Sequence, residues 1–127
     1  MSNTILLNKD DICMVIDTRQ PGNECLLLEG RLVIKNAAEI KTGLLTALNC
    51  SQNLTLVFRK IQKLDTTVLQ LLLALQKSAS QLGKTVHFDM ESTDYIKSVM
   101  LHSGMDNIPA INFKIHLNGV HRYNFDS

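Results

Sequence analysis

The stretch that decides the fold is KIQKLDTTVLQLLLALQKSASQLG, residues 60–83. It passes from polar and basic residues through Asp65, Thr66 and Thr67 into a helix pattern, and either Asp65 or Thr66 suits the N-cap. Apolar residues then recur at intervals of three and four, which places them on one face: Val68, Leu71, Leu72, Leu75, Ala79 and Leu82. Gly83 predicts the end of the helix, because glycine adopts the left-handed C′ conformation without steric cost. We therefore expect an amphipathic helix over residues 65–82.

Two leucines do not fit this apolar face. Leu69 and Leu73 lie roughly 100–140° around the helix from Val68. Either they pack beneath a neighbouring helix, as most leucines do, or they form an exposed apolar edge beside Thr66. In the second case a partner protein would dock on that edge.

The composition fits one domain of 127 residues, of which 45% are hydrophobic. A formal net charge of +1 without a basic stripe argues against nucleic-acid binding. No apolar run approaches the ~20 residues that cross a membrane, and residues 1–10 lack the apolar segment of a signal peptide. We therefore expect a cytoplasmic protein that does not insert into a membrane.

The polar residues predict neither an enzyme nor a metal or cofactor site. There is no phosphate-binding loop, no dinucleotide-binding glycine pattern and no nucleophile elbow. The histidines show no metal-ligand spacing with cysteines or carboxylates. His87 and Asp89 would share one face of a strand, which suits a ligand pair, although a solvated strand face is the expected role. The three cysteines lack a CxxC pair and are expected to be free, buried thiols: Cys13, Cys25 and Cys50.

The remaining elements alternate strand and helix. Strand patterns occupy residues 11–17, 25–28, 53–58 and 84–90, and residues 18–23 between the first two predict a hairpin. Residues 29–30 end the second strand, and residues 59–64 are expected to be a loop. One helix begins at Asn36, with Glu39 completing a capping box, and ends before residues 49–52. A third is capped by Ser92 or Thr93 and ends at Gly104. Single helices between strands imply parallel pairing through right-handed crossovers, an α/β fold.

Residues 108–127 form a tail of different character. Phe113 and Ile115 belong to a strict apolar–polar alternation, and Asn118-Gly119 is a strong hairpin turn. Three roles are open to the tail: it extends the sheet, covers the domain or pairs with a second copy as a homodimer. We expect a domain over residues 1–107 and a C-terminal β extension over residues 108–127.

The order of these elements and the segment LDTT at residues 64–67 together resemble the STAS domain of bacterial anti-anti-sigma factors. Matching segments lie in the expected order: LEGRL at 28–32, GKTV at 83–86 and LHSGM at 101–105. The resemblance covers about residues 11–107. It implies a single STAS-like α/β domain, with a mostly parallel central sheet and helices packed on it. Two features depart from the family pattern, because Val68 replaces a common glycine and Arg59-Lys60 stands where acidic residues often occur.

The resemblance also implies a function. Phosphorylated members carry the modified hydroxyl directly after the aspartate, which here is Thr66, with Thr67 as a weaker candidate. The implied partner is an anti-sigma factor or a serine/threonine switch kinase. The residues expected to bind it are Asp65 and Thr66 of the motif, Lys63 in the preceding loop, and Leu69 and Leu73 of the possible apolar edge. The segment DTTVLQLL at 65–72 resembles the subgroups found near chemotaxis genes more than it resembles the sporulation members of the family. The alternative is therefore a constitutive scaffold or adaptor of a chemotaxis-type signalling or transport complex, without phosphorylation, in which residues 65–67 only cap the helix.

Overall fold

The computed structural model describes residues 3–91, 98 and 113–116. Within them the chain forms six strands, two α-helices and a short 3₁₀ helix. In chain order these are β1 (Asn3–Asn8), β2 (Ile12–Asp17), β3 (Cys25–Leu32), η1 (Ile34–Asn36), α1 (Ala37–Cys50), β4 (Asn53–Leu64), α2 (Thr66–Gln81), β5 (Thr85–Glu91) and β6 (Phe113–His116).

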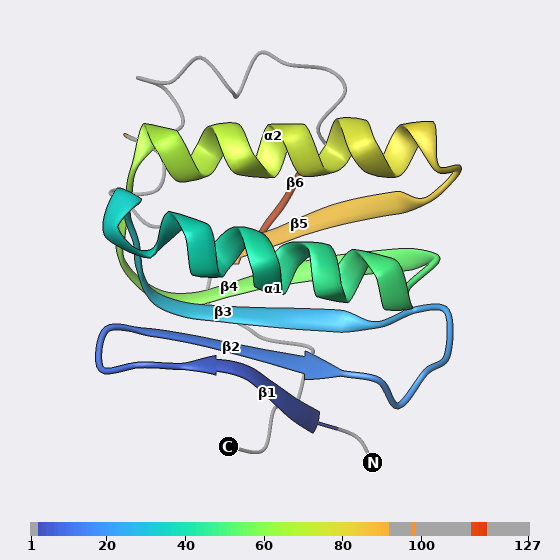
Figure 1. Cartoon of the computed structure of the whole chain (residues 1–127), viewed down its shortest axis with the longest axis horizontal. Helices are drawn as coiled ribbons and strands as arrows, with labels where there is room; N and C mark the ends of the chain where they lie inside the picture. Colours follow the sequence, from blue (N-terminus) through green and yellow to red (C-terminus); the bar gives the residue numbers. More distant parts are fainter. Residues whose placement is uncertain (1–2, 92–97, 99–112, 117–127) are drawn as a thin grey trace.

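The strands form one mixed sheet in the order β1-β2-β3-β4-β5-β6. The first three pair antiparallel, while β3, β4, β5 and β6 are parallel neighbours. Figure 1 shows α1 and α2 side by side on one face of the sheet, both starting at the end where β3 and β4 finish. The expected α/β architecture, with a mostly parallel sheet, packed helices and a C-terminal strand, is confirmed.

The core lies between the sheet and the two helices. Alternate residues of each strand point into it, because successive side chains of a strand face opposite sides. Phe58 of β4 and Phe88 of β5 meet edge to face, with ring centroids 6.2 Å apart. Aliphatic side chains, mainly leucine, fill most of the remaining space, as the low aromatic content of 5% requires.

The other face of the sheet is not a solvated face. Val15, Leu27 and Val57 form a second buried cluster there, and Asp89 is only 3% exposed. The prediction that His87 and Asp89 lie on a solvated face is therefore wrong for Asp89, whereas His87 is half-buried. Two expected buried thiols, Cys13 and Cys25, sit half-buried on this face.

The cysteines differ in their environments. All three are free. Burial, with a smaller contribution from nearby carboxylates led by Asp17, raises the pKa of Cys25 to about 11. The Cys25 thiol therefore stays protonated at neutral pH. Cys50, at the end of α1, is exposed, so the expectation that it is buried is wrong.

The structure adds one strand to the sequence prediction and extends two others. β1 was not anticipated, because its apolar residues neither alternate nor form a long run. β3 continues through Glu29 and Gly30, and β4 continues through the expected loop at residues 59–64. The register between β3 and β4 shifts on either side of Gly30, and Lys60 adopts a φ of 51°. Ile61 and Lys63 pair with Gly30 and Arg31, whereas Lys60 and Gln62 have no register partner in β3. The strand thus continues through a mostly polar segment whose composition indicated a loop.

The helix ends also differ. Asn36 precedes α1, but its side chain makes no cap hydrogen bond, so the expected capping box is wrong. α1 continues through Cys50 and does not end before residue 49. At the far end of α2, Leu82 is 60% exposed and does not belong to the core face. α2 ends at Gln81, one residue short of the prediction.

Only part of the predicted C-terminal region falls within the described residues. β6 pairs in parallel with β5, so this part of the tail extends the sheet. The third helix over residues 92–104 falls outside the described residues apart from residue 98, and the turn at Asn118-Gly119 lies outside them too. The division at residue 107 and pairing of the tail with a second copy stay predictions.

Candidate functional site

The predicted phosphorylation site lies where β4 passes into α2. Thr66 is the first residue of the helix and its side chain is exposed, whereas Thr67 is half-buried. The first N–H groups of a helix have no partner within it, and the helix dipole favours negative charge there. The Thr66 hydroxyl is thus accessible in a position that stabilises an anion.

Asp65 holds this junction in place through three hydrogen bonds. Its backbone N–H donates to Leu32 O at 2.9 Å, and its carbonyl accepts from Leu69 N at 3.1 Å. Its carboxylate Oδ2 accepts from the backbone N–H of Ile34 at 3.1 Å. Asp65 occupies the N-cap position, as predicted, but its side chain makes no cap hydrogen bond to α2. It binds the start of the neighbouring η1 helix to the start of α2.

The expected docking edge of leucines is not exposed. Leu69 is 1% exposed and belongs to the main core, and Leu73 is half-buried and packs against that core. Of the two alternatives for these leucines, packing inside the fold is therefore correct. The physical reason is that α2 contacts both α1 and the sheet, so that its apolar surface is wider than one stripe.

An apolar residue that the sequence analysis missed lies at the site instead. Ile34 is 67% exposed, and its backbone N–H is the group that binds Asp65. No periodicity marks Ile34, because it belongs to the three-residue η1 helix. Lys63, predicted as a binding residue, is exposed at the end of β4. Thr66, Ile34 and Lys63 therefore offer a hydroxyl, an apolar side chain and a cation at one end of the sheet.

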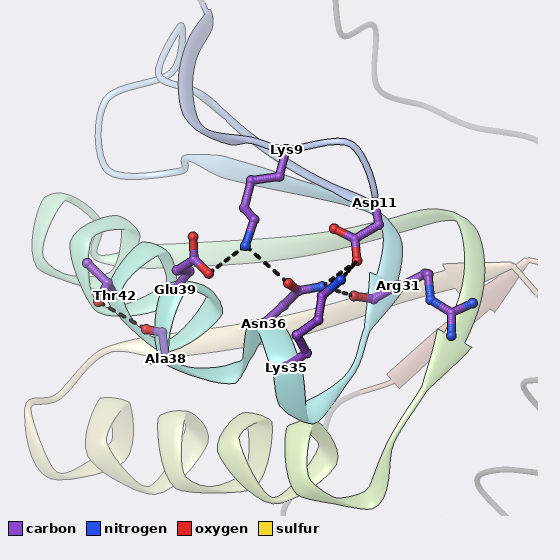
Figure 2. Close-up of polar contacts among 8 residues, drawn as sticks. All are labelled: Lys9, Asp11, Arg31, Lys35, Asn36, Ala38, Glu39 and Thr42. Carbon is purple, nitrogen blue, oxygen red and sulfur yellow. Dashed lines mark hydrogen bonds and ion pairs between the residues drawn. The ribbon is translucent and has the colours of Figure 1, made fainter.

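A buried asparagine fixes η1 and the start of α1 to the β1–β2 turn (Figure 2). Asn36 is fully buried, and its Nδ2 donates to Arg31 O at 3.0 Å and to Asp11 Oδ2 at 3.3 Å. Its Oδ1 accepts from Lys9 Nζ at 3.4 Å. Lys9 also binds Glu39 of α1 at 2.8 Å.

The charges of this network compensate one another. Hydrogen bonds from Lys35 and then Asn36 hold the pKa of Asp11 below its usual value, and Lys35 Nζ lies 3.0 Å from Asp11 Oδ2. The hydrogen bond to Glu39 raises the pKa of Lys9. The network is therefore a set of paired groups that holds η1 and the start of α1 against the β1–β2 turn.

Replacing Asn36 by alanine should destabilise the protein by about 2 kcal/mol, because it removes the hydrogen bonds of a buried side chain, including the one to the Arg31 carbonyl, and opens a small cavity. Urea unfolding followed by circular dichroism measures this loss. Glu39→Ala is the matched control, because it removes only the exposed pair with Lys9 and should cost well under about 1 kcal/mol. Equal effects of the two variants would contradict a structural role for the Asn36 side chain.

Other kinds of site find no support in the part of the chain that the structure describes. No three of its histidines, cysteines and carboxylates gather closely enough to hold a metal ion. Among the same residues, neither α-helix has the length and apolar character needed to cross a membrane. The arrangement around Thr66 suits modification and protein binding.

Comparison with known proteins identifies the fold. No protein-family model matches this chain, and no curated protein matches it in sequence. Solved structures do match, and one of them is the anti-sigma factor antagonist SpoIIAA in its unphosphorylated form. It is 12% identical over 83% of this chain and 89% of its own, with a TM-score of 0.64.

Two further structures agree. The Bacillus cell fate determinant SpoIIAA in its phosphorylated form is 12% identical over 83% of this chain and 92% of its own, with a TM-score of 0.60. An anti-sigma factor antagonist from Mycobacterium paratuberculosis is 12% identical over 87% of this chain and 86% of its own, with a TM-score of 0.61. The chain therefore has the STAS fold, as the sequence resemblance implied.

Proposed function

We propose that this chain is a non-catalytic, cytoplasmic regulatory protein of the anti-sigma factor antagonist type, whose binding to a protein partner is switched by phosphorylation of Thr66. The partner is an anti-sigma factor or a serine/threonine switch kinase. The observation that carries the proposal is the exposure of Thr66 at the first position of α2, beside an exposed isoleucine. The similarity to a protein solved in both phosphorylated and unphosphorylated forms supports it.

A phosphate on Thr66 would change the surface more than the fold. It carries about 1.5 to 2 negative charges near neutral pH. The unpaired N–H groups at the start of α2 would stabilise it by roughly 0.3–1 kcal/mol, as expected for an exposed anion at a helix N-terminus. The same charge beside Ile34 would oppose an apolar contact, because the partner would have to desolvate it. Binding is thus controlled by charge without a conformational change.

Replacing Thr66 by glutamate should weaken partner binding by roughly tenfold to a hundredfold, which is about 1.4–2.8 kcal/mol, while thermal stability stays within about 0.5 kcal/mol. Thr66→Ala should bind as the unmodified protein does and should not respond to the kinase. Affinity for the co-purified partner is measured by calorimetry, alongside mass spectrometry of Thr66 from the native cell.

Thr42→Glu is the matched control, because Thr42 is an exposed threonine within α1. It adds the same charge away from the β4–α2 junction and should leave affinity unchanged. If Thr66→Glu and Thr66→Ala bind equally well and Thr66 is never phosphorylated in the cell, the constitutive scaffold would be the better account of the chain.

A further inference from the structure

A single row of side chains crosses the sheet on the face opposite α1 and α2, which we call the outer face. Its members are direct register partners on five successive strands: Ile5, Val15, Leu27, Val57 and Asp89. Directly paired residues of neighbouring strands point to the same side of a sheet. Leu27 and Val57 belong to a cluster that is separate from the core beneath the helices. The outer face therefore carries a continuous apolar row that ends in a carboxylate.

This row is covered, and the cover has a direction. Val57 is 1% exposed, Leu27 and Asp89 are buried as well, and the cover still reaches Val15 of β2. At the end of the row, Ile5 of β1 is 60% exposed. Strand side chains stand roughly perpendicular to the sheet, so neighbouring strands cannot cover their tips. Both described α-helices pack on the opposite face (Figure 1), and the described turns join strands at the ends of the sheet. The cover therefore comes from another segment of the chain.

Topology leaves one segment for this role. Outside the described residues lie residues 1–2, 92–112 apart from residue 98, and 117–127. Residues 1–2 precede β1, where the row is exposed, and are too short to reach the middle of the sheet. The strands β3, β4, β5 and β6 follow one another in one direction and are parallel. A right-handed crossover from β5 to β6 therefore runs over the face that carries α1 and α2. Residues 117–127 remain for the outer face.

The C-terminal segment also has the required length and composition. It follows β6, which pairs with β5 at the edge of the sheet. Four strand spacings separate β6 from β2, which is about 19 Å, and residues 117–127 span up to roughly 36 Å when extended. The segment can thus make a turn and still reach β2. Its apolar side chains include Val120, Tyr123 and Phe125.

We propose that residues 117–127 form a strap that lies across the outer face and covers Leu27 and Val57 with its apolar side chains. The occupant of this face is the chain itself and not a partner protein. A protein that binds the outer face has to displace the strap first, and a second copy finds no free apolar row there. The inference goes beyond the proposed function and does not depend on phosphorylation of Thr66.

The first test replaces Tyr123 of the full chain by the photo-crosslinking residue benzoylphenylalanine. An equal mixture of ¹⁴N- and ¹⁵N-labelled protein is irradiated, and crosslinked peptides are identified by mass spectrometry. We expect crosslinks to residues 13–17, 25–29 or 55–59, with both peptides carrying the same isotope. The same residue in place of Leu45, an exposed leucine of α1, should not capture these strands. Crosslinks between isotopes would identify a second copy as the occupant, and crosslinks to α1 or α2, or none at all, would also overturn the proposal.

The second test weakens the strap with Tyr123→Asp/Phe125→Asp in the full chain. Alkylation of Cys25 by iodoacetamide should become about tenfold faster, because charge in the strap favours local opening of the outer face. Cys25 is half-buried and packs against the row, whereas Cys50 is exposed and should react at an unchanged rate.

The matched control is Leu45→Asp/Leu82→Asp, which adds the same charge at two exposed leucines, in α1 and just beyond α2. It should leave the alkylation rate of Cys25 unchanged. A folded strap variant in which Cys25 reacts no faster, or equal acceleration in both double variants, would contradict the strap. Circular dichroism separates local opening from unfolding, and the crosslink decides if the strap variant does not fold.

Discussion

Leu69→Asp should unfold the domain. Leu69 is 1% exposed within the core between α2, α1 and the sheet. Aspartate there would lose the apolar contacts and bury a charge without a partner, which costs about 4–5 kcal/mol or more. That is comparable with the whole stability of a small domain, about 5–15 kcal/mol. Circular dichroism and urea titration of the purified variant measure the effect.

The matched control is Leu82→Asp, the same substitution just beyond the other end of α2. Leu82 is 60% exposed, so the change should alter stability by only about 0.5 kcal/mol. A folded Leu69→Asp protein that lost only its partner would restore the exposed leucine edge as the docking site. The contrast therefore separates a core leucine from an interface leucine.

Gly30→Ala should destabilise the protein by about 3 kcal/mol or more. Gly30 has a φ of 109°, which residues with a side chain rarely adopt, and a Cβ there would lie 2.3 Å from the backbone oxygen of Asp11. The obstacle is backbone of the β1–β2 turn, so it cannot rotate away as a side chain would. Backbone strain alone costs about 1–3 kcal/mol, and the steric overlap adds to it. Thermal and urea unfolding measure the loss.

Gly22→Ala separates the two contributions. Gly22 also has a positive φ, 85°, but nothing lies within 4 Å of the position a Cβ would take. It should therefore cost only the conformational strain, about 1 kcal/mol. Similar losses for both glycines would show that the close approach to Asp11 is not what makes Gly30 necessary.

The sequence predicted the fold class and the helix that carries the site because both depend on repeated patterns. The alternation of strands and helices determines a parallel arrangement. The spacing of apolar residues by three and four positions in residues 65–82 determines α2. The exposure of Thr66 agrees with its place at the start of that helix. The single-face interpretation failed at Leu69, because a helix that contacts both a sheet and another helix is buried over a wider arc than one stripe.

The surface around Thr66 was harder to predict because it depends on register and local irregularity. Residues 59–63 are polar apart from Ile61, and such a composition indicates a loop, yet with two shifts in pairing β4 continues through them. Only the pairing of β3 with β4 places Arg31 opposite Lys63. Ile34 is exposed because η1 interposes a turn between β3 and α1, and no periodic signal marks so short an element.

The hydrogen bond from Ile34 to Asp65 gives this protein a built-in spectroscopic reporter. The amide proton of residue 34 is shared with the carboxylate that directly precedes Thr66. Its nuclear magnetic resonance frequency therefore depends on the electric field at that carboxylate. A ¹⁵N-labelled sample should show the residue 34 signal move when Thr66 gains charge, while signals from the distant β2–β3 turn stay in place. One amide would thus report the modification state of Thr66 in solution without a chemically attached probe.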